Sequence, residues 1–427
     1  MNLLERLMKG AAKIEPAEIR ATLLSFAFIF TLMASYYIMR PLRDAMSSDW
    51  SDAELSTLWT GTFVFSVLAV LVYGAACSKV NFRRLVPGVY GFFAASFLCF
   101  YAAIQSAADS VYVDKAFYLW VSVFSLFHVS VFWSLMADMY SKAQAPRLFG
   151  FIASGASIGA IAGPAIAVAL VNSVGTGNLL LISVVLLLVP IAIIAMLRHA
   201  EDGAIRPPSA EQSIGGNPFA GFGIFMRSPL LLGIGLFIFL YTAISTFVYF
   251  ELKNLMSGVE ETVRVQIWGG MDLAVNILAI GTAMFGTSRL ATRFGLTFTL
   301  VLVPIVIVAG LLVVAMAPML WVVVALQVVR RAGNYAITKP GREMLFTIVD
   351  RETRFKAKSV VDIVVYRGGD ALTAWAFTGL TQGLGLGLGA VAAIGAGIAA
   401  IWAVVARFLG RAYERDGKPA PSASEYA

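Results

Sequence analysis

The chain has few charged residues. Asp, Glu, Lys and Arg make up 13% of its 427 residues, whereas 59% of the residues are hydrophobic. Soluble globular proteins are about a quarter charged, so this chain lacks the polar surface that a soluble protein of its length needs. The composition excludes a soluble enzyme, a disordered regulator and a secreted disulfide scaffold.

Cysteine and histidine are also scarce. Cys77 and Cys99 lie in apolar runs and form neither a disulfide framework nor a CxxC metal motif. His128 and His199 are too few to build a zinc site. The sequence has no GxxxxGK[ST] phosphate-binding loop. We therefore expect no metal, no cofactor, no ATP hydrolysis by this chain alone and no enzymatic activity.

In place of these features the sequence has many long apolar runs. A helix needs about 20 apolar residues to cross a bilayer, and the runs lack the alternation of β-barrel strands. We predict an all-α membrane protein with twelve transmembrane helices. The predicted spans are residues 21–39, 55–76, 85–104, 116–136, 148–171, 179–197, 230–250, 267–285, 296–317, 320–337, 359–380 and 388–406.

One long polar segment divides these spans into two sets of six. It covers residues 198–229 and contains Pro207-Pro208 and Gly215-Gly216, which are typical of a flexible linker. The predicted parts of the chain are a cytoplasmic N-terminal segment, a six-helix bundle, a cytoplasmic linker, a second six-helix bundle and a cytoplasmic tail. Their bounds are residues 1–20, 21–197, 198–229, 230–408 and 409–427.

The distribution of basic residues predicts the orientation. If both termini lie on one side of the membrane, that side carries 24 of the 32 Lys and Arg residues and the other side carries five. Basic residues concentrate on the cytoplasmic side of membrane proteins, so we expect both termini in the cytoplasm of a bacterial-type inner membrane. The same rule accounts for the net charge of +7 without a nucleic-acid partner.

The two sets of spans also repeat. A shift of about 210 residues aligns Leu42-Arg43 with Leu252-Lys253 and Ser78-Lys79 with Ser288-Arg289. A parallel repeat of six helices resembles the architecture of major facilitator transporters, in which the substrate site lies near the middle of the membrane. This 6+6 arrangement is the predicted fold.

Several ionisable residues fall inside or at the ends of the predicted spans, where each costs about 2.5–3.5 kcal/mol at a helix centre. Arg330 and Arg331 have no acidic neighbour within four residues of their own helix, which favours a substrate or cross-helix role. Arg367 and Asp370 are spaced i,i+3 and either neutralise each other or act on the substrate. Lys358 and Asp362 are spaced i,i+4 and likewise either pair with each other or act on the substrate.

Other groups keep two interpretations as well. Asp272 is either an ion-coupling carboxylate or the partner of a basic residue on another helix. His128 is either a core histidine or a proton relay. Arg43 and Lys253 either serve the substrate and the gates or extend to the membrane interface.

Three segments resemble the nucleotide (ATP:ADP) antiporter family, a branch related to the major facilitators. The first contains Tyr37, Arg40 and the pair Arg43-Asp44, and resembles the family's first-helix motif. The second is Phe132-Trp133 followed by Arg147-Leu-Phe149-Gly150. The third contains Arg342-Glu343-Met344, Asp350, Lys356, Lys358 and Asp362, and resembles the stretch Lys-Glu-Met … Lys-Gly-Lys-x-x-Ile-Asp. Pro41 and Asp370 stand where the family has an acidic residue and a lysine, which marks a divergent bacterial-type branch.

The resemblance implies exchange of ATP against ADP or related phosphorylated anions by alternating access. It assigns phosphate or salt-bridge roles to Arg43, Arg342, Lys356 and Lys358. Combined with the residues inside the spans, it yields two sets of candidates. The substrate-binding set is Arg43, Arg330, Arg331, Arg367, Tyr37, Trp133 and Tyr335. The gating or coupling set is Asp44, Lys253, Asp272, Arg342, Glu343, Lys356, Lys358, Asp362 and Asp370.

Two other functions are compatible with the same sequence. The first is a proton-coupled major facilitator for another organic anion or a drug-like solute, in which Asp272 or His128 carries the proton. The second is a membrane component that transports nothing but keeps this scaffold. The expected partners are a small anionic solute and the lipid bilayer.

Overall fold

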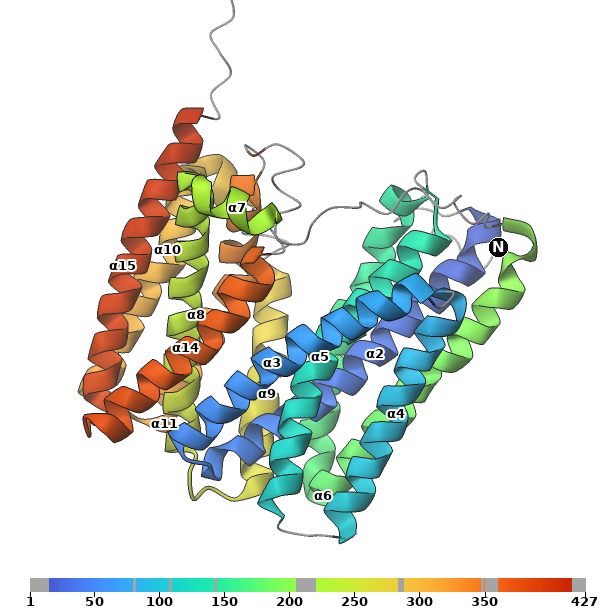
Figure 1. The fold of residues 1–427 in the computed structure, drawn as a ribbon, viewed down its shortest axis with the longest axis horizontal. Coiled ribbons are helices and arrows are strands. Elements are labelled where there is room, and N and C mark those ends of the chain that lie inside the picture. Colours follow the sequence, from blue (N-terminus) through green and yellow to red (C-terminus); the bar gives the residue numbers. More distant parts are fainter. Residues whose placement is uncertain are drawn as a thin grey trace, which may run out of the picture. The chain divides into compact units, whose positions relative to one another are not determined.

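The computed structural model describes residues 15–79, 82–106, 110–141, 144–204, 220–282, 288–346, 349 and 360–416. Within this part of the chain the regular elements are all helical, as predicted. Figure 1 shows the long helices, which are coloured along the sequence. Eight segments of the described residues are long and apolar enough to cross a membrane.

The helices of the first half follow the predicted spans closely. They are α2 (Ile19–Met46), α3 (Asp52–Lys79), α4 (Phe82–Ser106), α5 (Val111–Met139) and α6 (Ala145–Ala204). Gly175 divides α6 into two helices because its φ of 80° is not helical, and glycine adopts this conformation at little cost. These two parts of α6 correspond to the predicted spans 148–171 and 179–197.

Part of the polar segment between the two sets of predicted spans is helical. Helix α7 (Ala220–Arg227) lies within the segment 198–229 that the sequence suggested as a flexible linker, and α6 extends to Ala204. Phe225 of α7 is buried, and its ring lies where a Cβ on Gly235 of α8 would be. This packing of an apolar side chain explains why the end of the polar segment is helical.

The remaining elements are α8 (Pro229–Leu255), α9 (Glu261–Thr282), α10 (Ser288–Met316), α11 (Leu320–Gly333), α12 (Lys339–Leu345), α14 (Tyr366–Thr378) and α15 (Leu388–Asp416). A π-helical turn, η4 (Asn334–Thr338), joins α11 to α12. Two further π-helical turns, η6 (Val360–Val365) and η7 (Gly379–Gly383), flank α14. The elements α11, η4 and α12 follow one another without a break, and so do η6, α14 and η7. If each of these two series is counted as one helix and α6 as two, the described residues contain a helix at all twelve predicted positions.

The chain divides into two compact units, each of which packs mainly against itself. Unit 1 comprises Met1–Ser48, Val64–Ser213 and Gly258–Asn276, and unit 2 comprises Asp49–Phe63, Ile214–Ser257 and Ile277–Ala427. Two segments thus belong to a different unit from the rest of their half of the sequence. They are Asp49–Phe63, at the start of α3, and Gly258–Asn276, which contains the start of α9. The two segments are related by the shift of about 210 residues, so the division follows the internal repeat. The predicted bundles, 21–197 and 230–408, stay a prediction.

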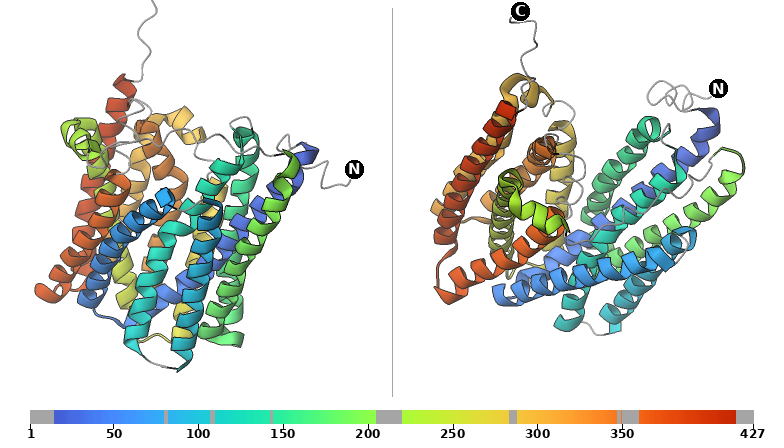
Figure 2. Two further views of the ribbon diagram at one scale, coloured as in Figure 1. Left: turned by 45° about the vertical axis from the view of Figure 1, so that its right-hand side comes forward. Right: turned by 45° about the horizontal axis from the view of Figure 1, so that its top comes forward.

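Unit 1 is built on the contact between α2 and α6, which run side by side in Figures 1 and 2. Gly155, Gly159 and Gly163 line this contact. A Cβ at these positions would collide with the backbone oxygens of Phe26, Phe30 and Ala34 of α2, respectively. Glycines at this i,i+4 spacing therefore let the two helices approach closely. In unit 2 the main contact joins α10 and α15.

Candidate functional site

An ion-pair cluster lies at the end of α2 in unit 1. Arg43 and Asp44 follow Arg40 by three and four residues, so both lie close to its face of the helix. The Arg43 guanidinium donates to Asp44 Oδ1 from Nη2 at 2.6 Å and from Nε at 2.9 Å. Arg40 lies 3.7 Å from Asp44 and 3.7 Å from Asp272 of α9, and both carboxylates are buried. The structure therefore brings Asp272 to a basic residue on another helix, which is one of its two predicted interpretations.

Aromatic and hydroxyl groups complete this cluster. Arg43 also donates to Ser122 Oγ at 3.3 Å and lies over the Tyr118 ring of α5. The guanidinium carbon of Arg40 lies 5.8 Å from the centre of the buried Tyr37 ring. Arg43 is thus held by protein groups on two helices and does not extend freely to the membrane interface.

The aromatic candidates of unit 1 are separate from one another. Trp133 packs against Phe132 and Phe149. Tyr36, which lies next to Tyr37, stacks on His128 with a centroid distance of 4.4 Å. His128 is buried, and the backbone of Phe124 and Ser125, one turn before it on α5, lies within hydrogen-bonding reach of its imidazole. Both predicted interpretations of His128, a core histidine and a proton relay, stay open.

A second group of arginines lies in unit 2 on α11. Arg330 and Arg331 are 3% and 4% exposed. Gln327, one turn before Arg330, accepts hydrogen bonds with its Oε1 from Nη2 at 2.8 Å and from Nε at 3.1 Å. Tyr241 of α8 accepts from Arg330 Nη1 at 3.2 Å with its hydroxyl oxygen. Neutral groups therefore hold the Arg330 guanidinium in place.

The other members of this group come from α14 and η4. Asp370 interacts electrostatically with Arg367 and Arg330. No ion pair within 4.0 Å joins Arg367 to Asp370 among the described residues. Tyr366 lies close to Tyr241, with ring centroids 6.4 Å apart, and it also interacts with Tyr335. We call the set Gln327, Arg330, Arg331, Tyr335, Tyr241, Tyr366, Arg367 and Asp370 the α11–α14 cluster.

The backbone beside this cluster is unusual. Tyr335 belongs to the π-helical turn η4, and Arg367 follows directly after the π-helical turn η6. Such turns are rare and often occur at functional sites. Both helices that carry the arginines of the cluster adjoin one, which supports a functional role for this part of unit 2.

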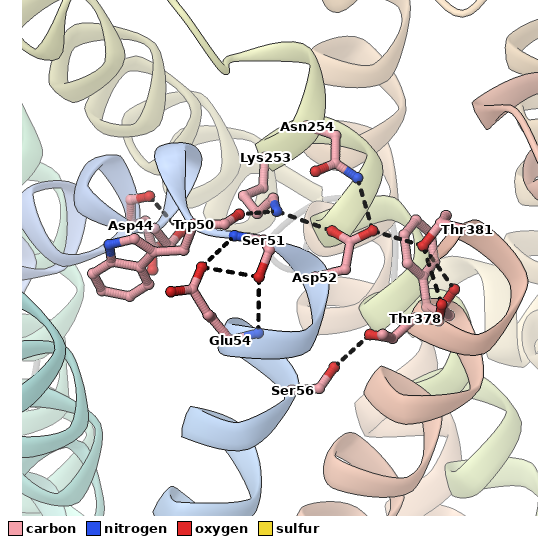
Figure 3. A network of polar contacts seen from close by, with 12 residues as sticks. Asp44, Trp50, Ser51, Asp52, Glu54, Ser56, Lys253, Asn254, Thr378 and Thr381 are labelled. Atoms are coloured by element: carbon pink, nitrogen blue, oxygen red, sulfur yellow. Dashed lines mark hydrogen bonds and ion pairs between the residues drawn. The ribbon is translucent and has the colours of Figure 1, made fainter. Parts of the chain in front are cut away.

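Lys253 is the centre of a third network, also in unit 2 (Figure 3). Its Nζ donates to Asp52 Oδ1 at 2.9 Å and to the Trp50 carbonyl oxygen at 2.5 Å. Thr381 Oγ1 donates to Asp52 Oδ2 at 2.7 Å. Lys253 is 1% exposed, so it is a buried ion-pair partner and does not reach toward the membrane interface.

The local sequence explains how Asp52 is placed there. Ser51 and Glu54 form a capping box, in which Glu54 N donates to Ser51 Oγ at 3.2 Å and Ser51 N donates to Glu54 Oε2 at 2.8 Å. This cap starts α3 at Asp52 and directs the carboxylate toward the end of α8 (Figure 3).

The remaining candidates lie near α12 or outside the described residues. Arg342 Nη2 lies 2.8 Å from Glu343 Oε1. Lys356 and Lys358 lie outside the described residues, and Asp362 is described only as part of the η6 backbone. No group of three or more His, Cys, Asp or Glu residues in the described part of the chain is arranged to hold a metal ion.

Sequence reasoning missed several polar residues of these networks, among them Gln327, Tyr241, Tyr366 and Asp52. Gln327, Tyr241 and Tyr366 are neutral, so a search for charges inside the spans does not select them. Asp52 precedes the predicted span 55–76 and escaped attention for that reason. For Gln327 a signal was available, because its i,i+3 spacing places it on the same helix face as Arg330.

Three solved structures share the fold of this chain. A bacterial homologue of the human lysosomal transporter Spinster is 15% identical, with a TM-score of 0.62 over 96% of this chain and 100% of that chain. A bacterial homologue of the iron transporter ferroportin is 12% identical, with a TM-score of 0.66 over 93% of this chain and 100% of that chain. The nucleoside transporter NupG is 15% identical, with a TM-score of 0.59 over 92% of this chain and 99% of that chain. No curated protein matches the sequence.

The family follows from the sequence itself. The sequence profile of the Major Facilitator Superfamily matches residues 22–340, which is more than half of the chain. The helical repeat and the solved structures with the same fold agree with this match. The chain therefore belongs to the major facilitator superfamily and is a membrane transporter of that type.

Proposed function

We propose that this transporter exchanges nucleotides or related phosphorylated anions by alternating access in a bacterial-type inner membrane, with both termini in the cytoplasm. The observation that carries the proposal is the environment of Arg330. Its guanidinium is buried in the α11–α14 cluster and is held by an amide and a phenol. Such a group retains its positive charge for a ligand.

The composition of the α11–α14 cluster supports an anionic substrate. Its described charged groups are the guanidiniums of Arg330, Arg331 and Arg367 and the carboxylate of Asp370. A guanidinium has a planar array of N–H donors that matches two oxygens of a phosphate. Tyr335 is 40% exposed and interacts with Tyr241 and Tyr366 of the same cluster, so it supplies an accessible aromatic ring there.

The resemblance to the nucleotide antiporter family narrows the anion to a nucleotide. Its motifs include Arg43-Asp44 and Arg342-Glu343, and both pairs form ion pairs in the structure. We assign these pairs, together with Arg40-Asp272 and Lys253-Asp52, to the gates that open and close during the transport cycle. Since Arg43 is paired with Asp44, we assign phosphate binding first to Arg330, Arg331 and Arg367.

Exchange is tested with purified protein in liposomes. Vesicles loaded with ADP should take up labelled ATP much faster than empty vesicles do. Arg330→Gln should abolish this difference, because it removes the charge that holds the phosphate. Arg411→Gln, an exposed arginine at the end of α15, is the matched control and should behave as wild type. The proposal is wrong if no common nucleotide inside the vesicles stimulates uptake.

The environment of His128 favours one alternative, proton-coupled transport of another organic anion. Its imidazole is buried, stacks on Tyr36 and has no carboxylate in an ion pair with it among the described residues, and imidazole is the side chain that most readily takes up and releases a proton near neutral pH. This alternative predicts that a protonophore stops uptake and that solute on the opposite side has no effect. Exchange predicts the reverse for both measurements.

A further inference from the structure

Gln327 holds Arg330 in a way that differs from three other buried or half-buried cations in the described part of the chain. Arg43 bonds Asp44 at 2.6 Å, Arg147 bonds Glu18 at 2.9 Å and Lys253 bonds Asp52 at 2.9 Å, so each of these cations is paired with a carboxylate. At Arg330 the corresponding acceptor is the amide oxygen of Gln327, and the Asp370 carboxylate acts on the guanidinium electrostatically without a hydrogen bond to it. A carboxylate of nearly the same size at this position would neutralise the guanidinium, and the amide does not.

The hydrogen bonds leave part of the guanidinium available. Arginine has five N–H donors. Gln327 Oε1 accepts from Nε and from one N–H of Nη2, and Tyr241 accepts from one N–H of Nη1. One N–H on each terminal nitrogen remains. Each of these remaining N–H groups is able to donate a charge-assisted hydrogen bond to a phosphate oxygen.

Burial makes this arrangement specific. Gln327 is 2% exposed and Tyr241 is 7% exposed, so water does not compete freely for their bonds to Arg330. Gln327 is fixed relative to Arg330 by the i,i+3 spacing on α11, whereas Tyr241 comes from α8. The guanidinium is therefore held on two sides, by groups from two helices, before any ligand arrives.

We propose that Gln327 and Tyr241 are positioning residues that orient Arg330 without neutralising it, and that the α11–α14 cluster thereby selects phosphorylated, anionic nucleotides over neutral nucleosides. This inference rests on the proposed function. It assigns a role to two neutral residues and gives the basis on which the site distinguishes ligands, namely their charge.

The test compares ligands of increasing charge on variants of one residue. Adenosine, AMP and ADP are titrated into purified protein, and the dissociation constants are measured by displacement of labelled ADP. Gln327→Glu keeps the size and one acceptor oxygen but adds a negative charge. Gln327→Leu removes the acceptor. Gln105→Glu, at an exposed position near the end of α4, makes the same chemical change away from the cluster.

The added carboxylate of Gln327→Glu should neutralise the Arg330 guanidinium and so weaken its charge-assisted hydrogen bonds to the phosphate. ADP binding should therefore weaken by about tenfold to a hundredfold. The loss should be largest for ADP, smaller for AMP and absent for adenosine. Gln327→Leu should weaken ADP binding less, since it loosens Arg330 but keeps its charge. Tyr241→Phe should have a small effect in the same direction, and Gln105→Glu should have none.

Two results would overturn the inference. One is that Gln327→Glu binds ADP as wild type does. The other is that Gln327→Glu weakens all three ligands equally, which would give Gln327 a structural role only. Both are distinguishable from failure of the proposed function, which would appear as wild-type protein that binds neither AMP nor ADP. The unfolding temperature of each variant without ligand shows whether the variant is folded.

Discussion

Lys253 and Asp52 form a buried ion pair across 201 positions of sequence, with Nζ 2.9 Å from Oδ1. The side chains are 2% and 6% exposed. Asp52 also accepts from Thr381, and Lys253 also donates to the Trp50 carbonyl oxygen. Both charges therefore have further hydrogen-bond partners, as a buried ion pair requires.

Removing one member of this pair should be costly. Lys253→Met leaves the Asp52 carboxylate buried without its counter-charge and should destabilise the protein by about 3–5 kcal/mol. The double variant Lys253→Met/Asp52→Leu removes both charges and should recover a large part of this loss. Thermal unfolding of the two variants in detergent measures the difference. Equal destabilisation by both would show that the ion pair is not the cause.

Two glycines of α6 give a matched pair for the contact with α2. Gly159→Ala places a Cβ against the Phe30 backbone oxygen and should destabilise unit 1 by about 1–3 kcal/mol. Gly150→Ala, where nothing lies within 4 Å of the added Cβ, should be neutral or stabilising by up to about 1 kcal/mol. Unfolding temperatures test both, and similar values for the two variants would contradict the close packing.

Glu18 connects the start of α2 to the start of α6. It accepts from Arg147 Nη2 at 2.9 Å and from Gln144 Nε2 at 2.9 Å, and it is 5% exposed. Glu18→Gln removes the charge from these bonds and should cost about 1–3 kcal/mol of stability. Glu15→Gln, at a carboxylate that is 68% exposed and 3.6 Å from Arg147, should change stability little. The unfolding temperatures should therefore separate the two variants, even though both lose a carboxylate next to the same arginine.

Asp272 distinguishes an ion-pair role from a proton-carrying role. If it serves as the partner of Arg40, Asp272→Asn should slow nucleotide exchange and leave its insensitivity to a protonophore unchanged. Asp138→Asn, at an exposed position on α5, is the control. A wild-type exchange rate that depends on the proton gradient, with loss of this dependence in Asp272→Asn, would assign the proton to Asp272.

Much of the fold was predictable because lipid imposes simple rules. A crossing helix must be long and apolar, and it must satisfy its own backbone, so the apolar runs mark the helices directly. The i,i+4 spacing of Gly155, Gly159 and Gly163 is likewise typical of closely packed membrane helices. These rules do not predict local deviations such as the helix α7, whose stability depends on the tertiary contact of Phe225.

The candidate site was predictable only in part. Arg330 and Arg331 stand out because charges are rare inside apolar runs. Gln327 and Tyr241 do not, since their role depends on their distance to Arg330 in the folded chain. The pairing of Lys253 with Asp52 was also hidden, because contacts between distant segments are not encoded in local spacing. Lys356 and Lys358 lie outside the described residues, so their assigned roles stay predictions.

The π-helical turn η4 has a consequence for the phase of the helix that contains it. Residues 334–338 include one position more than an α-helical turn would use. If this turn became regular α-helix with all of its residues kept, α12 would rotate by about 100° about the helix axis relative to α11. Arg330 would stay where Gln327 holds it, and Arg342 would face a different direction. The turn thus fixes the relative direction of two arginines, and substitutions that preserve every side chain of the cluster could still misalign them.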